Sequence, residues 1–131
     1  MTLYRLKLFI TLLLLNKKKK KWYFEFNNVS SDLKKILQKA QEHHFILGYK
    51  MYYDKKITGI VLAYDQEGQS VLTNIKMVKY KGQQMVISFA TAKVIFNNPY
   101  ILCFVRTKIG ILTIDECRTF GFGGEVLALF Y

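Results

Sequence analysis

The final third of the chain carries the pattern that most restricts how it can fold. Residues 101–105 (ILCFV) form a continuous apolar run, which predicts a fully buried strand. A polar turn at 106–110 follows this run, and the apolar pair 111–112 resumes the sheet. Thr113 and Glu116 have the spacing of a capping box, which predicts a helix of one to two turns ending at Gly121. This stretch therefore predicts paired strands beside a short helix.

The flanking residues complete a predicted C-terminal lobe over residues 80–131. Gly123 and Gly124 predict a tight loop, and residues 125–131 predict a final hydrophobic strand. The other expected elements are a strand at 85–89, a short helix at 90–96 that Asn97-Asn98-Pro99 stops, and a linker between lobes at 79–84 around Gly82. The lobe is thus expected to be mostly β with short helices.

Residues 1–79 predict an N-terminal lobe with the element order α-β-α-β-β. Its best-defined helix follows Ser30 and Ser31, either of which suits the N-cap, and Gly48 is expected to cap its C-terminus. Its apolar face has helical spacing and consists of Leu33, Ile36, Leu37, Ala40 and His44. The other expected elements are strands at 22–26, 49–53, 57–64 and 71–78, with a hairpin loop at 65–69. The predicted fold class is α/β (α+β), built from two small lobes.

The leucine-rich opening of the chain has three possible roles. The spacing of Leu3, Leu6, Phe9 or Ile10, and Leu13 predicts an amphipathic helix over residues 3–15 that docks on the body. Its apolar run at 8–15 is much shorter than the roughly 20 residues that a membrane-spanning helix needs. A targeting element and a membrane-surface anchor are the alternatives.

Positive charge is concentrated in this opening. The chain has 20 Lys and Arg against 9 Asp and Glu, a net charge of +11. Residues 1–24 hold seven basic and no acidic residues, so the remainder is only mildly basic at +4. The lysine run 17–21 is expected to be a solvated loop, and Lys17, Lys18 and Lys19 could lie along phosphates. This charge favours a polyanionic partner such as RNA, an acidic surface or an anionic membrane.

The sequence offers little to an enzyme or a metal. GxSxG, HExxH and paired-carboxylate patterns are absent, and residues 121–124 lack the Lys-Ser/Thr of a phosphate-binding P-loop. Cys103 and Cys117 lack CxxC spacing and are expected to act as small hydrophobes. Adjacent His43 and His44 point to different faces of a helix and cannot chelate one ion together. We therefore expect no catalytic residue, metal, cofactor or small-molecule substrate.

The turn 106–110 is the sharpest functional signal in the chain. A buried strand would hold it rigidly, Arg106 and Lys108 add positive charge, Thr107 offers a hydroxyl, and Gly110 lets the backbone approach a partner. A turn of this kind can donate to RNA phosphates, 2′-hydroxyls and base edges.

The same residues carry a family resemblance. The run TKIGILT at 107–113, then Arg118, Gly121 and Gly123-Gly124-Glu125 before a hydrophobic strand, resembles the C-terminal signature of the small-subunit ribosomal protein eight family. That family typically reads Ser-Thr-Ser-x-Gly followed by two apolar residues and Thr, and the spacing here matches without a gap. Ser30, Ser31, Lys34 and the helix behind them resemble its N-terminal half.

The resemblance implies a two-lobed structural protein that binds the central domain of small-subunit rRNA directly and early in assembly. By position it nominates Arg106, Thr107 and Lys108 for RNA contact, with Gly110 shaping the loop. The supporting residues it nominates are Gly123, Gly124 and Glu125 beside this loop, and Ser30, Ser31 and Lys34 as an N-terminal RNA-facing segment. Neighbouring small-subunit ribosomal proteins are the other implied partners.

The chain departs from the family pattern at both serines, which are Arg106 and Lys108 here. Longer cations can still reach phosphate, exchanging hydroxyl selectivity for charge. This divergence and the lysine-rich composition favour a mitochondrial ribosome, with another organelle or the cytoplasm as alternatives. The alternative function is a peripheral membrane-surface protein anchored by the leucine-rich helix and the lysine run.

Overall fold

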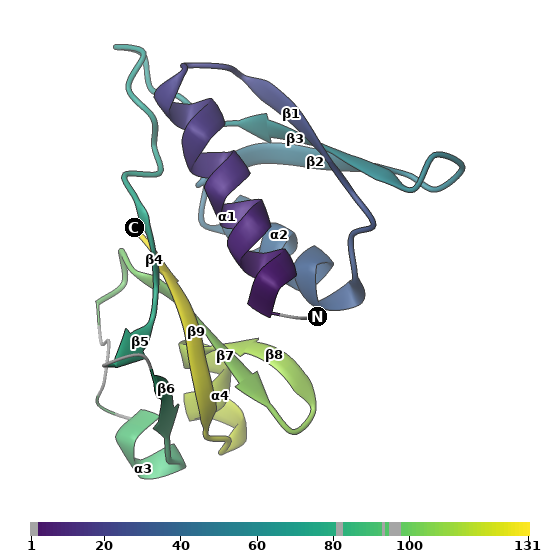
Figure 1. Ribbon diagram of the computed structural model, residues 1–131. Helices are drawn as coiled ribbons and strands as arrows, with labels where there is room; N and C mark the ends of the chain where they lie inside the picture. The colour runs from purple at the N-terminus through teal and green to yellow at the C-terminus, as the bar shows by residue number, and fades with distance from the viewer. Residues whose placement is uncertain (1–2, 81–82, 93, 95–97) are drawn as a thin grey trace. The chain divides into compact units, whose positions relative to one another are not determined.

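The chain folds into two compact units, Met1–Asn74 and Ile75–Tyr131, which we call the N-terminal and C-terminal units. The computed structural model describes residues 3–80, 83–92, 94 and 98–131 (Figure 1). Each unit has its own sheet and its own helices, and the α+β class predicted from the sequence is confirmed.

The N-terminal unit has the predicted order α-β-α-β-β. Its three-stranded sheet has the order β1-β3-β2, and both strand pairs are antiparallel. Its elements are α1 (Leu3–Lys18), β1 (Tyr23–Asn27), α2 (Ser31–Glu42), β2 (Ile46–Tyr52) and β3 (Ile57–Leu62).

The C-terminal unit is a six-stranded sheet with two short helices. The strand order is β5-β6-β9-β7-β8, and β4 also pairs with β9, so β9 pairs with the three strands β4, β6 and β7. Its elements are β4 (Ile75–Met77), β5 (Lys79–Tyr80), β6 (Gln83–Ile87), α3 (Phe89–Ala92), β7 (Leu102–Thr107), β8 (Gly110–Thr113), α4 (Ile114–Phe120) and β9 (Gly124–Phe130).

The leucine-rich opening is a docked helix. Its side chains Leu6, Phe9, Ile10 and Leu13 are all buried, as the spacing predicted. The Phe9 ring lies against the β1 aromatics Phe24 and Phe26, with ring centroids 6.2 and 5.5 Å away. The apolar face that a membrane anchor would need is therefore occupied inside the protein. Among the residues that the structure describes, no helix has the length and apolarity to cross a bilayer.

The lysine run is the end of this helix, and its prediction as a loop is wrong for Lys17 and Lys18. Both belong to α1, where positive charge is favourable at the helix C-terminus. The backbone N–H of Lys20 donates to the Lys17 carbonyl and that of Lys21 to the Asn16 carbonyl, each at 3.0 Å. With Lys20 at a φ of 56°, this is the Schellman pattern that commonly ends helices.

Helix α2 begins as predicted and ends differently. Ser30 is its N-cap and accepts a hydrogen bond from the backbone N–H of Leu33, which settles the choice between the two serines. The expected inward placement of His44 and the expected cap at Gly48 are both wrong. The helix ends at Glu42, His44 is exposed with a φ of 63°, and Gly48 lies within β2. His44 thus occupies the left-handed position that glycine usually fills.

Replacing His44 with glycine should stabilise the protein by about 0.5–1 kcal/mol. Glycine adopts a positive φ without the steric cost that a side chain adds there. Urea unfolding of the wild type and the His44→Gly variant measures the difference. A His43→Gly variant is the control, because His43 has a φ of −90° and should lose stability instead. Equal destabilisation by both changes would contradict the assignment of His44 to the left-handed position at the end of α2.

The middle of the chain departs most from its prediction. The strand expected at 71–78 is reduced to Ile75–Met77, and the linker expected at 79–84 is wrong because Lys79–Tyr80 and Gln83–Ile87 are strands. The short helix occupies Phe89–Ala92, and the expected loop at 65–69 closes through a bridge between Tyr64 and Ser70. Lys81 and Gly82 of the linker, and Lys93 and residues 95–97 of the expected helix and its stop, lie outside the described residues.

Both cysteines belong to the buried core of the C-terminal unit. Cys103 and Cys117 are fully buried there with Val105, Ile114 and Val126. Burial raises the pKa of the Cys103 thiol from about 9 to about 12. They act as small apolar side chains, as predicted.

Cys103 should make stability fall at high pH. The unfolded chain ionises this thiol near pH 9 whereas the folded chain does so near pH 12, so alkali favours unfolding in that window. The contribution is complete below about pH 9 and lost by about 1.4 kcal/mol per pH unit above it. Urea unfolding at pH 8 and pH 10.5 should therefore show the stability advantage of wild type over Cys103→Ala shrinking by about 2 kcal/mol. Parallel pH profiles for the two proteins would contradict this.

Candidate nucleic-acid interface

The turn predicted to contact RNA is the tip of the β7–β8 hairpin. Thr107 pairs with Gly110, so only Lys108 and Ile109 lie between the strands. The Thr107 hydroxyl donates to the Gly110 carbonyl at 2.7 Å and accepts from the Ile109 N–H at 3.3 Å. Gly110 has a φ of 118°, a conformation that side chains rarely adopt. Thr107 and Gly110 therefore fix the loop shape, and the Thr107 oxygen keeps one lone pair for a partner.

Arg106 lies one residue before this tip and is oriented by β9. It is directly opposite Glu125 in the β7–β9 ladder, and its guanidinium Nη1 is 3.8 Å from the Glu125 carboxylate Oε2. The Arg106 side chain is 36% exposed and that of Glu125 is 15% exposed. Glu125 therefore restrains one side of a cation that still reaches solvent.

Gly123 and Gly124 bring the start of β9 close to two other strands. A Cβ on Gly124 would lie 2.1 Å from the Arg106 carbonyl oxygen, and one on Gly123 would lie 2.4 Å from the Ile87 carbonyl oxygen. Both atoms belong to backbone and cannot swing away as a side chain would. Gly124 thus allows the close approach of β9 to β7 beneath the hairpin tip, and Gly123 allows its close approach to β6.

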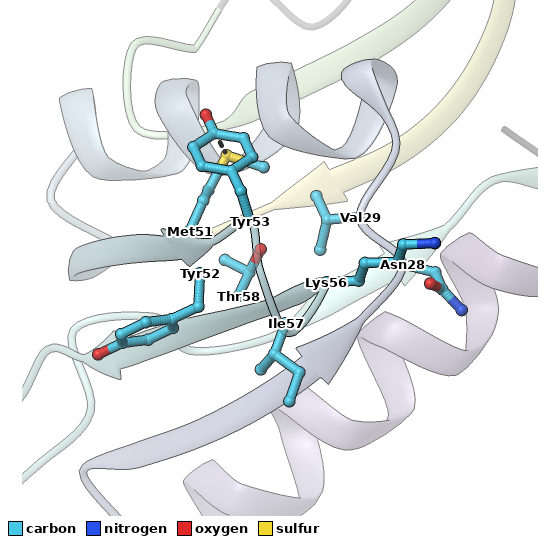
Figure 2. Close-up of a pocket in the computed structure, with 8 residues that line it drawn as sticks. All are labelled: Asn28, Val29, Met51, Tyr52, Tyr53, Lys56, Ile57 and Thr58. Carbon is cyan, nitrogen blue, oxygen red and sulfur yellow. Dashed lines mark hydrogen bonds between the residues drawn. The ribbon is translucent and has the colours of Figure 1, made fainter.

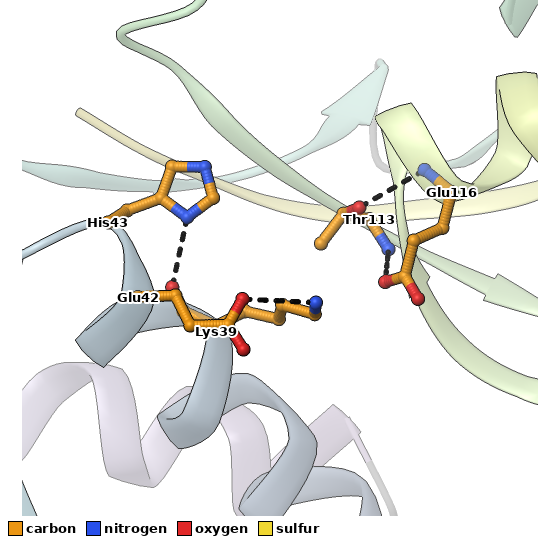
Figure 3. Close-up of polar contacts among 5 residues, drawn as sticks. All are labelled: Lys39, Glu42, His43, Thr113 and Glu116. Carbon is orange, nitrogen blue, oxygen red and sulfur yellow. Dashed lines mark hydrogen bonds and ion pairs between the residues drawn. The ribbon is translucent and has the colours of Figure 1, made fainter.

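Helix α4 fixes the other strand of the hairpin. The Thr113 hydroxyl accepts the Glu116 N–H at 3.2 Å, and the Glu116 carboxylate accepts the Thr113 N–H at 3.1 Å, the predicted capping box (Figure 3). Arg118 on this helix donates to the Ala92 carbonyl and pairs with Asp115, each at 2.7 Å. The helix ends at Gly121, as predicted, with a φ of 80°.

The hairpin tip exposes one residue that sequence reasoning passed over. Lys108 and Ile109 are the exposed residues at the tip, and Ile109 is 64% exposed. An apolar side chain between two cations and a glycine is the signal that could have identified it. It offers an apolar surface to a base or a neighbouring protein.

The N-terminal candidate residues form two separate groups. Ser30 is engaged as the α2 cap, whereas Ser31 and Lys34 are exposed on the first turn of α2. The Arg5 guanidinium donates to the Asn27 carbonyl just before α2, which places this group near the start of α1. Lys17, Lys18 and Lys19 lie at the other end of α1, about 18 Å further along its axis.

The N-terminal unit also contains a cavity that none of the predicted residues lines. It has a volume of about 320 Å³ at the β2–β3 turn, where Tyr52, Tyr53 and Lys56 meet Asn28 (Figure 2). Its lining has no carboxylate, histidine or cysteine, and its ionisable groups are the phenols of Tyr52 and Tyr53 and the ammonium of Lys56. Within the described part of the chain, no three His, Cys, Asp or Glu residues cluster as metal ligands would.

Fold and site together define a basic, two-unit α+β protein with a cationic hairpin tip. The sequence model of the family described as Ribosomal protein S8 matches residues 12–131, nearly the whole chain. The chain belongs to the ribosomal protein S8 family, whose members are structural proteins of the small ribosomal subunit. This confirms the family resemblance carried by the C-terminal signature.

Bacterial relatives show the same similarity. The small ribosomal subunit protein uS8 of Thermodesulfovibrio yellowstonii is 34% identical over 98 residues, covering 73% of this chain and 72% of the relative. The protein of the same name from Campylobacter fetus is 34% identical over 103 residues, covering 77% and 75%. That from Nautilia profundicola is 30% identical over 102 residues, covering 76% and 77%.

Proposed function

We propose that this protein is a structural constituent of the small ribosomal subunit and binds the central domain of small-subunit rRNA directly. The observation that supports this most is the β7–β8 tip, where Arg106 and Lys108 lie on either side of Thr107, whose hydroxyl closes the turn by donating to the Gly110 carbonyl. Strand β9 holds the base of the tip through Gly124 and Glu125. The C-terminal lobe, residues 80–131, is the proposed RNA-binding region.

The residues of this site have different proposed roles in RNA recognition. Arg106 and Lys108 would neutralise phosphates and reach base edges, while Thr107 and Gly110 preserve the loop that presents them. Glu125 would limit the directions that the Arg106 side chain can take, since the two lie opposite each other in the β7–β9 ladder. Ser31 and Lys34 would contact a second stretch of backbone.

Two measurements test the proposal. The purified chain should bind a transcribed central-domain fragment of small-subunit rRNA more tightly than a fragment of equal length from the large subunit. In cells, the tagged protein should sediment with small subunits through a sucrose gradient at moderate salt. Equal affinity for both RNAs, or recovery only at the top of the gradient, would refute it.

We further propose that the ribosome concerned is organellar. The divergence at Arg106 and Lys108 and the lysine-rich composition support this, although the relatives described above are bacterial. Cell fractionation followed by gradient sedimentation tests it. Recovery with mitochondrial small subunits is expected, and recovery with cytoplasmic ones alone would refute it.

A further inference from the structure

A cleft that three lysines line lies between the end of α1 and the segment that follows β3. Its volume is about 340 Å³, within the range of sites that hold small ligands. Lys17, Lys18 and Lys20 line one side, and the polar side chains of Gln69, Ser70 and Asn74 line the other. In Figure 1 the segment after β3 runs beside the C-terminal end of α1.

Hydrogen bonds hold the two sides of the cleft together. The Lys17 ammonium donates to the Thr73 carbonyl, and the Tyr64 hydroxyl donates to the Lys21 carbonyl. The Schellman turn at Lys20 fixes the backbone of the run between these two points. The lysines are therefore presented by folded structure rather than by a free tail.

The charge of the cleft suits an anion. Its lining has three lysines and no carboxylate. Two acids lie nearby on the 65–69 loop, where Asp65 accepts the backbone N–H groups of Glu67 and Gln69, and Glu67 is exposed. Positive charge at the end of α1 is also favourable to the helix dipole, but the dipole does not account for the cleft beside it, which Gln69, Ser70 and Asn74 line as well.

We infer that this cleft binds consecutive phosphates of an RNA backbone, as a second contact distinct from the β7–β8 tip. Lys18 and Lys20 would contact phosphate oxygens, and the amides of Gln69 and Asn74 would face the sugar hydroxyls. The inference rests on the proposed function, because the RNA is taken to be the same rRNA. It assigns different roles to neighbouring lysines of one run: Lys18 and Lys20 line the cleft, while Lys19 and Lys21 do not.

RNA fits this surface better than an anionic membrane does. A lipid surface needs a continuous apolar face to insert beside the cations. The apolar face of α1 is buried at Leu6, Phe9 and Leu13, and the exposed apolar residues beside the lysine run are Leu15 and Trp22, one at each end of it. The cleft is also concave and has amides opposite its lysines, which suits a sugar–phosphate chain.

The test compares two double variants that lose the same charge. Lys18→Gln/Lys20→Gln should lower the slope of log affinity against log salt for the rRNA fragment by about 2, whereas Lys19→Gln/Lys21→Gln should change it much less. A Tyr64→Phe variant keeps the charge but releases Lys21, and should weaken RNA binding as well. Thermal melts of all three variants separate loss of contact from loss of fold.

Each outcome decides the question. If both lysine double variants lowered the salt slope of RNA binding equally, the lysines would act as diffuse charge and the proposed cleft contact would be wrong. It would also be wrong if neither double variant lowered the slope. The RNA cleft would also be overturned if the Lys18→Gln/Lys20→Gln variant lost binding to vesicles containing phosphatidylserine but kept the RNA affinity of wild type. If wild type itself fails to bind the rRNA fragment, the proposed function falls. If wild type binds and only the Arg106–Lys108 variants weaken it, the cleft alone falls.

Discussion

Replacing Arg106, Thr107 and Lys108 together with alanine should weaken binding to the small-subunit rRNA fragment by about 4 kcal/mol, or roughly a thousandfold. Good single contacts to nucleic acid are worth about 1–3 kcal/mol each. The variant removes two cations and also the hydroxyl that closes the loop through the Gly110 carbonyl. Filter binding or calorimetry at fixed salt measures the change.

The single variant Thr107→Ala distinguishes the loss of charged RNA contacts from a change in the shape of the loop. Thr107→Ala should lose less than the triple variant and leave the salt slope unchanged, because it removes no charge. Lys50→Ala/Lys55→Ala is the matched control, since both lysines are exposed on β2 and the turn after it, outside the proposed site. The site assignment is wrong if the control weakens binding as much as the triple variant.

Replacing Gly124 with alanine should destabilise the C-terminal unit by about 3 kcal/mol. The new Cβ would lie 2.1 Å from the Arg106 carbonyl oxygen, so β9 must separate from β7 at the Arg106–Glu125 pair. Overpacking of this kind costs typically 1–3 kcal/mol, and here ladder hydrogen bonds are weakened as well. Urea unfolding followed by circular dichroism gives the loss.

A second glycine in a strand serves as the control for this variant. A Cβ on Gly48 in β2 would meet nothing nearer than the Gln41 side chain at 3.8 Å, an ordinary contact. Gly48→Ala should therefore leave stability within about 1 kcal/mol of wild type. Comparable losses in the two variants would mean that the close approach at Gly124 is not what holds β9 in place.

The prediction from sequence was most accurate where local rules act alone. The Thr113–Glu116 capping box, the Gly121 helix end and the apolar spacings of α1 and α2 are set within a few residues, and the structure shows all of them except the inward placement of His44. The α2 end was missed because the αL position is held by His44, a residue that disfavours it, while Gly48 seemed better suited.

Long-range pairing explains the other differences. Strands were expected at 71–78 and 85–89, but they form at 75–77 and 83–87, where β9 pairs with them, and no local pattern reveals that register. The close approach of Gly124 to Arg106 and the ion pair from Glu125 also depend on that register. The lysine cleft needs the 64–74 segment beside α1, and nothing in either segment alone predicts the other.

The position of β9 also has a consequence during synthesis of the chain. Strands β4, β6 and β7 all precede β9, and each pairs with it. While Gly124–Phe130 is still in the exit tunnel, these strands present unsatisfied edges, and such edges invite aggregation. The three strands of the N-terminal sheet all precede the C-terminal unit, so this sheet can form first, and the β7–β8 tip acquires its final shape only when β9 pairs with β7.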